Sequence, residues 1–172
     1  MNALLETARL RLRPWTVDDV VRAAPIFADP ATMATYDDRE PWDTARLRRE
    51  VARWIESQES RGFSLWAVER RDTGELIGGC GFLDCEDTGE LEIHFVIARS
   101  QWGQGFATEA ARAAVEHGAG PLGLPRIAGV VWPGNAASEA VLRKLGFAFE
   151  RRIPFFGAEA LLYALTRPER PA

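Results

Sequence analysis

Residues 100–118, SQWGQGFATEAARAAVEHG, constrain the fold more than any other segment, because two glycines stand where an apolar strand gives way to a helix. The preceding residues, LEIHFVIAR, have the alternating pattern of a strand. The following residues place small side chains at helical spacing on one face, which suits close packing on a sheet: Ala107, Ala110, Ala111, Ala114 and Val115. Glycine inside a helix costs about 1 kcal/mol relative to alanine, so the pair requires an explanation.

Gly103 and Gly105 allow two interpretations. They permit a tight turn, or they leave the helix end open to a ligand, because the first N–H groups of a helix have no internal partner and carry partial positive charge. A phosphate group binds well at such an end. The segment has neither the G-x-x-x-x-G-K-[ST] pattern of a P-loop nor the third glycine of the dinucleotide fingerprint. The ligand interpretation is therefore a pyrophosphate held by backbone amides.

The remaining periodicities predict a mixed α/β fold in a single domain, residues 1–172. Strands are expected at residues 8–15, 63–70, 76–85, 91–99 and 126–132, with a terminal hairpin at 147–153 and 160–166. Helices are expected after Thr16, which can act as N-cap, at residues 43–60, at 104–117 and at 135–146, where Gly146 ends the last one. D-T-G-E turns favour an antiparallel meander. The prediction is a central, mostly antiparallel sheet flanked by about four helices.

Charge and cysteine usage narrow the class of protein. A formal net charge of -4 argues against a nucleic-acid partner bound by bulk electrostatics. The first residues lack the pattern of a signal peptide, and no apolar run of about 18 residues can span a membrane, so a cytoplasmic location without a membrane partner is expected. Cys80 and Cys85 are five residues apart on one strand and should face opposite sides, so neither a disulfide nor a metal site is expected.

Two motifs carry a resemblance to a known family. VIARSQWGQGFATEA resembles the acyl-CoA-binding motif of the GNAT N-acetyltransferase superfamily, particularly its RimJ/RimL-like branch, although Trp102 stands where the superfamily has Gln or Arg. NAASEAVLRKLGF is similar to that branch's N-x-x-S-x-x-x-L-x-K-x-G-F signature. The resemblance implies a GNAT fold, acetyl-CoA as co-substrate and no metal. It implies these acetyl-CoA-binding residues: Val96, Ile97, Trp102, Gly103, Gln104, Gly105, Phe106, Ala107, Thr108, Asn135 and Lys144.

The strand before the glycines carries the candidate base. Alternation puts Glu92, His94 and Val96 on one face, with Glu92 and His94 about 7 Å apart along the strand. In many relatives a glutamate at the Glu92 position is implicated as a base that takes the proton of the amine, directly or through water. The alternative is an ordinary solvent-facing carboxylate. His94 stands where the family often has glycine, and we expect it to shape the substrate site or to pack.

The resemblance also suggests how the thiol leaves. Many members have a tyrosine as acid where this chain has Leu142, and Rim-like members are thought to use the serine that corresponds to Ser138. Asn135 and Ser138 are three residues apart and share a helix face, so both can reach the pantetheine arm and the thioester. The alternative for Ser138 is a hydroxyl that only faces solvent. The oxyanion donor is expected to be a backbone N–H near Val96.

The acceptor side is less defined by sequence. Tyr36 and Trp42, with His94, are the predicted substrate contacts, in a loop whose carboxylates suit a cationic amine; a solvated loop explains them equally well. A protein α-amine, with a pKa of about 8, is roughly a tenth neutral at pH 7, whereas a lysine amine is far less so. The acceptor stays open between a peptide N-terminus and a small molecule such as a polyamine or antibiotic. An acyl-CoA-binding regulatory module without turnover is the alternative to an enzyme, and both monomer and homodimer remain open.

Overall fold

A mixed, mostly antiparallel sheet of eight strands runs through the chain in the order β1-β2-β3-β4-β5-β6-β8-β7. The computed structural model describes residues 5–166. Its strands are β1 Leu5–Glu6, β2 Leu10–Arg13, β3 Leu65–Arg70, β4 Leu76–Cys85, β5 Glu90–Ile97, β6 Arg126–Val131, β7 Ala148–Phe155 and β8 Ala158–Thr166. Among these strands only β5 and β6 pair in parallel. The predicted meander, β3-β4-β5, and the predicted terminal hairpin, β7-β8, are confirmed.

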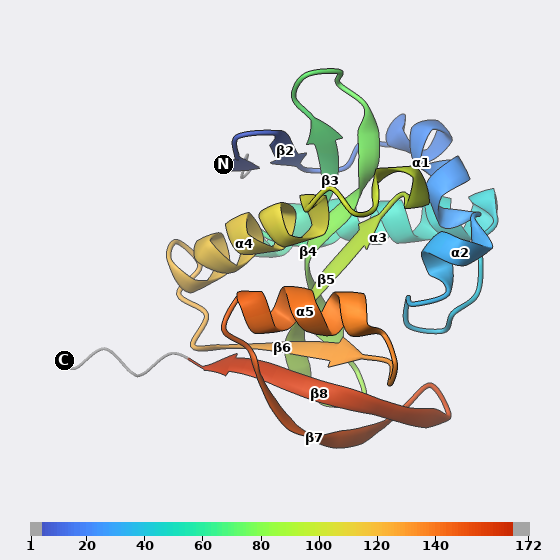
Figure 1. The fold of residues 1–172 in the computed structure, drawn as a ribbon. Helices are drawn as coiled ribbons and strands as arrows, with labels where there is room; N and C mark the ends of the chain where they lie inside the picture. The colour runs from blue at the N-terminus through green and yellow to red at the C-terminus, as the bar shows by residue number, and fades with distance from the viewer. Residues whose placement is uncertain (1–4, 167–172) are drawn as a thin grey trace.

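The helices cover both faces of this sheet (Figure 1). They are α1 Asp19–Phe27, α2 Pro30–Met33, α3 Thr44–Arg61, α4 Phe106–Ala119 and α5 Ala136–Lys144. The helices α4 and α5 lie on one face, and α1, α2 and α3 pack on the other. The short helix α2 was not expected from the sequence. It begins because the Asp29 carboxylate accepts the Thr32 N–H and Pro30 occupies the first turn.

The start of α1 differs from the prediction. Its N-cap is Asp18, whose side chain caps nothing within the described residues, and Thr16 is not the cap. Thr16 instead donates its hydroxyl to the Asp19 carboxylate at 2.9 Å. Asp19 is 2% exposed and accepts two hydrogen bonds from Arg13, at 2.7 and 2.8 Å. The buried ion pair therefore fixes the entry of the helix, in place of a local cap.

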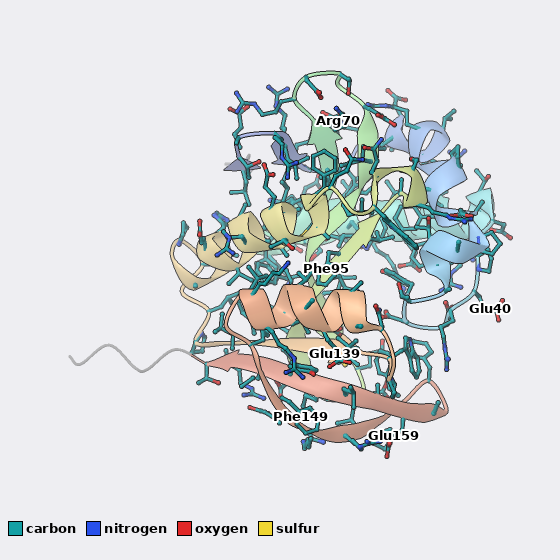
Figure 2. All side chains as sticks on the ribbon, in the orientation of Figure 1. Glu40, Arg70, Phe95, Glu139, Phe149 and Glu159 are labelled. Carbon is teal, nitrogen blue, oxygen red and sulfur yellow. The ribbon has the colours of Figure 1, made fainter. Side chains whose placement is uncertain are left out.

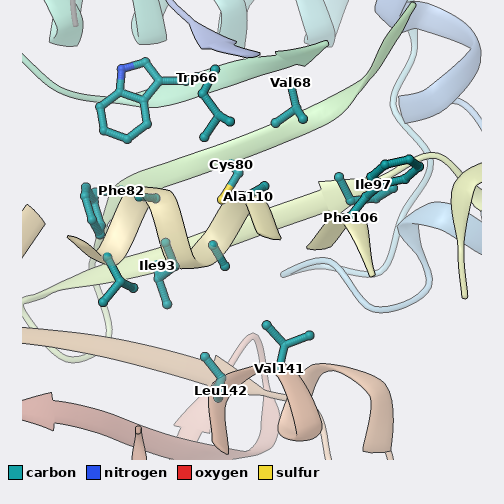
Figure 3. Packing of buried hydrophobic residues seen from close by; sticks show 14 of the residues in the cluster. Trp66, Val68, Cys80, Phe82, Ile93, Ile97, Phe106, Ala110, Val141 and Leu142 are labelled. Carbon is teal, nitrogen blue, oxygen red and sulfur yellow. The ribbon is translucent and has the colours of Figure 1, made fainter. Parts of the chain in front are cut away.

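Small side chains set the position of α4 on the sheet. Ala110, Ala111 and Ala114 are fully buried, so the helix lies close to β4 and β5, as the stripe of alanines predicted. Figure 3 shows Ala110 of α4 beside Cys80, with Phe82 near the far end of the helix. A Cβ on Gly118 would lie 2.6 Å from the Phe82 ring, so the ring fits only because this position has no side chain.

A cluster of aromatic rings holds α1, α2 and α3 against the opposite face. Trp42 stacks on Phe27 at a centroid distance of 5.1 Å, and Trp15 lies 5.2 Å from Trp54. Each ring is at most 4% exposed. Burying a large apolar side chain contributes about 1.5–3 kcal/mol. The cluster thus fixes the loop between α2 and α3 and brings Tyr36, which contacts Trp42, to the edge of β5.

Cys80 and Cys85 belong to different apolar clusters, and both are free thiols. This agrees with the prediction that they do not pair.

No helix within residues 5–166 is long and apolar enough to cross a membrane.

Candidate active site

The two parallel strands at the centre of the sheet separate from each other. β5 and β6 are in register at Glu92 and Ala128, and the pairing does not extend along the rest of β5. The strands on either side remain fully paired, β5 with β4 and β6 with β8. A wedge-shaped gap therefore opens in the sheet beyond Glu92. Figure 2 labels Phe95 of β5 at this gap, between α4 and α5.

Side chains satisfy backbone groups that the separation leaves without a ladder partner. Glu92 reaches across the gap, and its Oε1 accepts the N–H of Val130 at 3.0 Å. At the open end, the indole N–H of Trp102 donates to the carbonyl of Ile97 at 2.7 Å. Glu92 is only 3% exposed, so the interpretation of Glu92 as a solvent-facing carboxylate is wrong. The hydrogen bond from Val130 therefore holds Glu92, the candidate base, inside the wedge.

The mouth of the wedge is the N-terminus of α4. Gly103 and Gly105 both have a left-handed backbone, with φ of 74° and 81°, and Gly105 is the N-cap. No side chain of the described chain caps this helix end. A Cβ on Gly103 would meet nothing within 4 Å. Arg9 fixes the junction, donating to the Gln104 carbonyl at 2.9 Å and to Glu109 at 2.7 Å. The first amides of α4 consequently face open space.

The second motif begins α5. Asn135 is its N-cap: the side-chain oxygen accepts the Ser138 N–H at 3.2 Å, and its amide donates to the Ser138 hydroxyl at 2.9 Å. The expectation that these two side chains lie together is confirmed. Leu142, where many relatives have tyrosine, is 1% exposed and presents an apolar side chain to the cavity that Asn135 and Ser138 also line.

These elements enclose a cavity of about 350 Å³, here called the wedge cavity. The predicted residues that line it are Tyr36, Glu92, His94, Val96, Ile97, Trp102, Gly103, Gly105, Phe106, Ala107, Asn135 and Ser138. Four predicted residues lie elsewhere. Gln104 and Lys144 are exposed outside it and Thr108 is half-buried on α4. Trp42, a predicted substrate contact, belongs to the aromatic cluster and lines a second cavity that is described below. Thus most of the motif residues converge, although they come from four separate segments.

The hydrogen-bond pattern of β5 determines which amides face the gap. The Ala98 N–H bonds to the Ile77 carbonyl across β4, and amides alternate in direction along an antiparallel ladder. Val96 therefore turns its own N–H toward β4. The amides of Phe95 and Ile97 face the gap, so an oxyanion donor near Val96 would be one of these neighbours and not Val96 itself.

His94 is the least expected feature of the site. Its side chain is 8% exposed, with Nε2 at 3.3 Å from Glu92 Oε2 and Nδ1 at 3.9 Å from Asp37 Oδ1. Glu92 and His94 lie on one face of β5, as alternation predicted, and the ends of their side chains meet across the spacing of about 7 Å along the strand. Burial by itself lowers the pKa of His94, but the charges of Glu92 and Asp37 outweigh it and raise the pKa to about 9. Burial raises the pKa of Asp37 to about 6, with the His94 cation opposing that rise.

A second cavity, of about 760 Å³ and here called the acidic cavity, lies against the same residues. Tyr36, Asp37, Glu92 and His94 line both cavities. Its other acidic lining residues are Glu50, Glu56, Asp84, Glu86 and Asp87. Its arginines are each held by a carboxylate: Arg46 by Asp38, Arg53 by Glu50 and Arg61 by Asp84. The acidic cavity therefore favours a cationic ligand, and its far wall is shared with the wedge cavity.

The family described as "Acetyltransferase (GNAT) domain" matches residues 9–148. The chain therefore belongs to the GNAT acetyltransferase family, and it is an enzyme of the N-acetyltransferase class. Members of this family take their acetyl group from acetyl-CoA. The alternative of a regulatory module without turnover is set aside by this membership.

Among individual proteins, the chain is similar to the N-acetyltransferase YoaA of Bacillus subtilis, at 36% identity over 87% of this chain and 85% of YoaA. It is 35% identical to YkkB of the same organism, over 89% of this chain and 91% of YkkB. An acetyltransferase from Agrobacterium tumefaciens has a TM-score of 0.83 at 25% identity, covering 96% and 95% of the two chains. RimL in complex with coenzyme A has a TM-score of 0.81 at 20% identity, covering 95% and 98%. The RimL match shows a shared fold.

Sequence reasoning missed two members of the site. Asp37 was seen only as part of an acidic loop, and nothing in the sequence relates it to His94, 57 residues away along the chain. Val130 was read only as a strand residue, although its amide holds Glu92. The signals that were present were the alternation of β5 and the negative charge of the loop. The contact itself follows only from the packing of the α2–α3 loop on β5.

Proposed function

We propose that this enzyme transfers acetyl from acetyl-CoA to a primary amine in a ternary complex, with acetyl-CoA in the wedge cavity and the amine in the acidic cavity. The observation that carries the proposal is that the two cavities share one wall, formed by Tyr36, Asp37, Glu92 and His94. Two substrates that enter from opposite sides meet there. Direct attack needs such a meeting point, because both reacting atoms must be held together.

The wedge cavity fits acetyl-CoA by its chemistry. The amides at the start of α4, from Gly103 to Ala107, are uncapped by side chains of the described chain and suit a pyrophosphate. Asn135 and Ser138 lie along the cavity where the pantetheine arm would run. In this proposal the amide of Phe95 or Ile97 binds the oxyanion that develops at the thioester carbonyl. The Ser138 hydroxyl donates its proton to the departing thiolate and regains one from the N–H that the attacking nitrogen loses on becoming an amide; the thiolate is a tolerable leaving group even without an acid.

Glu92 is the base in this proposal. Its Oε1 is engaged by Val130, and Oε2 faces His94 in the shared wall, so the carboxylate stands at the point where the amine arrives. A cationic amine must lose a proton during acetylation, and a positioned carboxylate can accept it. The acidic cavity attracts the cation before that step.

The size and charge of the acidic cavity favour an acceptor with more than one positive charge. Glu56, Glu86 and Asp87 line it without an ion-pair partner among the described residues. A narrow neutral slot would have favoured a single peptide terminus. Peptide N-termini still belong in the screen, because the solved RimL is named as an α-N-protein acetyltransferase of ribosomal L7/L12.

The test combines calorimetry with a thiol-release screen. We expect acetyl-CoA binding by calorimetry, and release of free thiol with polyamines or aminoglycosides above release with peptides of varied first residue. Glu56→Gln should raise the KM for the amine severalfold and leave that for acetyl-CoA unchanged, because Glu56 lines only the acidic cavity. Glu59→Gln, on the same helix but lining neither cavity, is the matched control. Absence of acetyl-CoA binding at millimolar concentration would refute the proposal.

A further inference from the structure

Three titratable groups form a continuous row in the shared wall. Glu92 is 3% exposed, His94 is 8% exposed, and the Asp37 side chain is 29% exposed. The row joins Glu92 Oε2 to His94 Nε2 at 3.3 Å and His94 Nδ1 to Asp37 Oδ1 at 3.9 Å. Exposure therefore rises from the candidate base to the far end of the row, which reaches solvent.

Glu92 has a difficulty that this row resolves. A base that takes one proton in every turnover must release one before the next. While both substrates fill the two cavities, the burial of Glu92 and its bond to Val130 keep it from bulk water. Its second oxygen lies 3.3 Å from Nε2 of the imidazole that leads outward. Imidazole is suited to pass a proton on, because it binds a proton at either ring nitrogen.

We propose that His94 and Asp37 carry the proton of the acceptor amine from Glu92 to solvent, an inference that rests on the acetyl transfer proposed above. The N–H bond of the ammonium breaks as an O–H bond forms on Glu92. Glu92 passes this proton to Nε2 of a neutral imidazole, and the imidazolium releases its Nδ1 proton through one bridging water, across the 3.9 Å to Asp37, from which the proton passes to bulk water. One proton leaves the amine and one reaches water. Exchange with water in the emptied cavity restores the starting tautomer.

The charges around His94 make the row sensitive to Asp37. The groups that face His94 are Glu92 on β5 and Tyr36 and Asp37 after α2. The next titratable or charged groups act on these neighbours: Arg46 and Glu50 on α3, Asp38 in the loop and Cys85 on β4. Arg46 is held by Asp38 at 2.6 Å and Glu50 by Arg53 at 3.4 Å, so these charges largely offset one another. The pKa of His94 is consequently governed by burial, Glu92 and Asp37.

A pH dependence follows. Burial lowers the pKa of His94, but the two carboxylates raise it to about 9, so the ring is a cation at neutral pH and cannot accept a proton. The route opens as pH rises toward 9, and kcat should rise with it. Asp37→Asn removes one of the two charges, so it should lower the pKa of His94 and move the rising limb to lower pH by about one to three units.

The experiment measures both quantities. The chain has two histidines, so a nitrogen-15 NMR titration resolves His94 against His117, which serves as internal reference. The kcat–pH profile is recorded with a saturating amine for the wild type, Asp37→Asn, His94→Gln and the control Asp18→Asn, an exposed carboxylate that lines neither cavity. We expect the shift in Asp37→Asn by both methods, together with a lower limiting kcat because an amide cannot accept the proton from Nδ1. At about pH 9, where the route is open, we expect a loss of kcat of at least about tenfold in His94→Gln and no change in Asp18→Asn.

An unmoved His94 titration and an unmoved kcat limb in Asp37→Asn would overturn the relay, and so would wild-type kcat in His94→Gln. If His94→Gln does not fold, the Asp37→Asn titration decides alone. Failure of the relay leaves thiol release by the wild type intact. Failure of the proposed function abolishes that release in the wild type, and the relay falls with it.

Discussion

Replacing Glu92 by glutamine separates its chemical role from its structural one. The amide has nearly the volume of the carboxylate, and its oxygen can still accept the Val130 N–H that Glu92 holds at 3.0 Å. The base is lost, so turnover should fall by at least about tenfold, or about 1.4 kcal/mol of transition-state free energy. Acetyl-CoA affinity should be retained, because the uncapped amides of α4 are untouched.

The same substitution has a stability effect that the structure lets us size. The pKa of His94 is raised from 6.5 to about 9, with burial opposing and Glu92 the larger of the two charges that raise it. Each unit is worth about 1.36 kcal/mol. At pH 7 the raised pKa of His94 then contributes about 2.5 kcal/mol to the free energy of unfolding, and Glu92→Gln should remove at most about 2 kcal/mol of this. A raised pKa stabilises fully below the unfolded value, and the contribution is lost as pH rises through 9, so the difference should vanish near about pH 10.

Thiol release with a saturating amine measures the loss of turnover, and calorimetry with acetyl-CoA measures the affinity. Urea unfolding at about pH 7 and pH 10 measures the loss of stability. Wild-type turnover in Glu92→Gln, with affinity retained, would refute Glu92 as base. An equal loss of stability at both pH values would refute the electrostatic coupling to His94.

Three further substitutions test other parts of the structure. Gly103 and Gly62 both have a left-handed backbone (φ 74° and 80°) with open space at the Cβ, so Gly103→Ala and its control Gly62→Ala should each lower the free energy of unfolding by about 1 kcal/mol. Only Gly103→Ala should weaken acetyl-CoA binding in calorimetry, on the order of tenfold. Equal affinities would contradict the pyrophosphate site. Burial raises the pKa of Asp19, but the hydrogen bonds from Arg13 and Thr16 together with the charge of Arg13 outweigh it and lower the pKa to about 2. Asp19→Asn should therefore lower the free energy of unfolding in urea at pH 7 by about 2 kcal/mol. This loss should shrink as pH falls from about 4 to 2, and a loss that stays constant would count against the ion pair. Ser138→Ala should cut kcat up to about tenfold and leave unfolding unchanged, since Asn135 still accepts the backbone N–H of that residue; an unaltered kcat would limit the hydroxyl to the start of α5.

Local chemistry determined most of the fold. The alternation of β3, β4 and β5, the alanine stripe of α4 and the glycine that ends α5 are patterns of nearest neighbours, which is why the sequence predicts them. Gly146 has a φ of 89°, and the Phe147 N–H closes back on the Leu142 carbonyl at 3.1 Å, as a helix end of this kind requires. The start of α1 was predicted wrongly because it depends on the ion pair between Asp19 and Arg13, and Arg13 also binds Glu69 on a strand far away in the sequence.

The sequence by itself determined the family, the glycine-opened helix end and the face of β5 that carries Glu92 and His94, because each depends on spacing within one segment. Only the tertiary structure decided that β5 and β6 separate, that Glu92 spans the gap to Val130 and that Asp37 meets His94. Those features join segments far apart in the chain, and no local pattern encodes which loop packs on which strand. The acid–base properties of the site arise there, because burial and the nearest charges set a pKa and only packing brings them together.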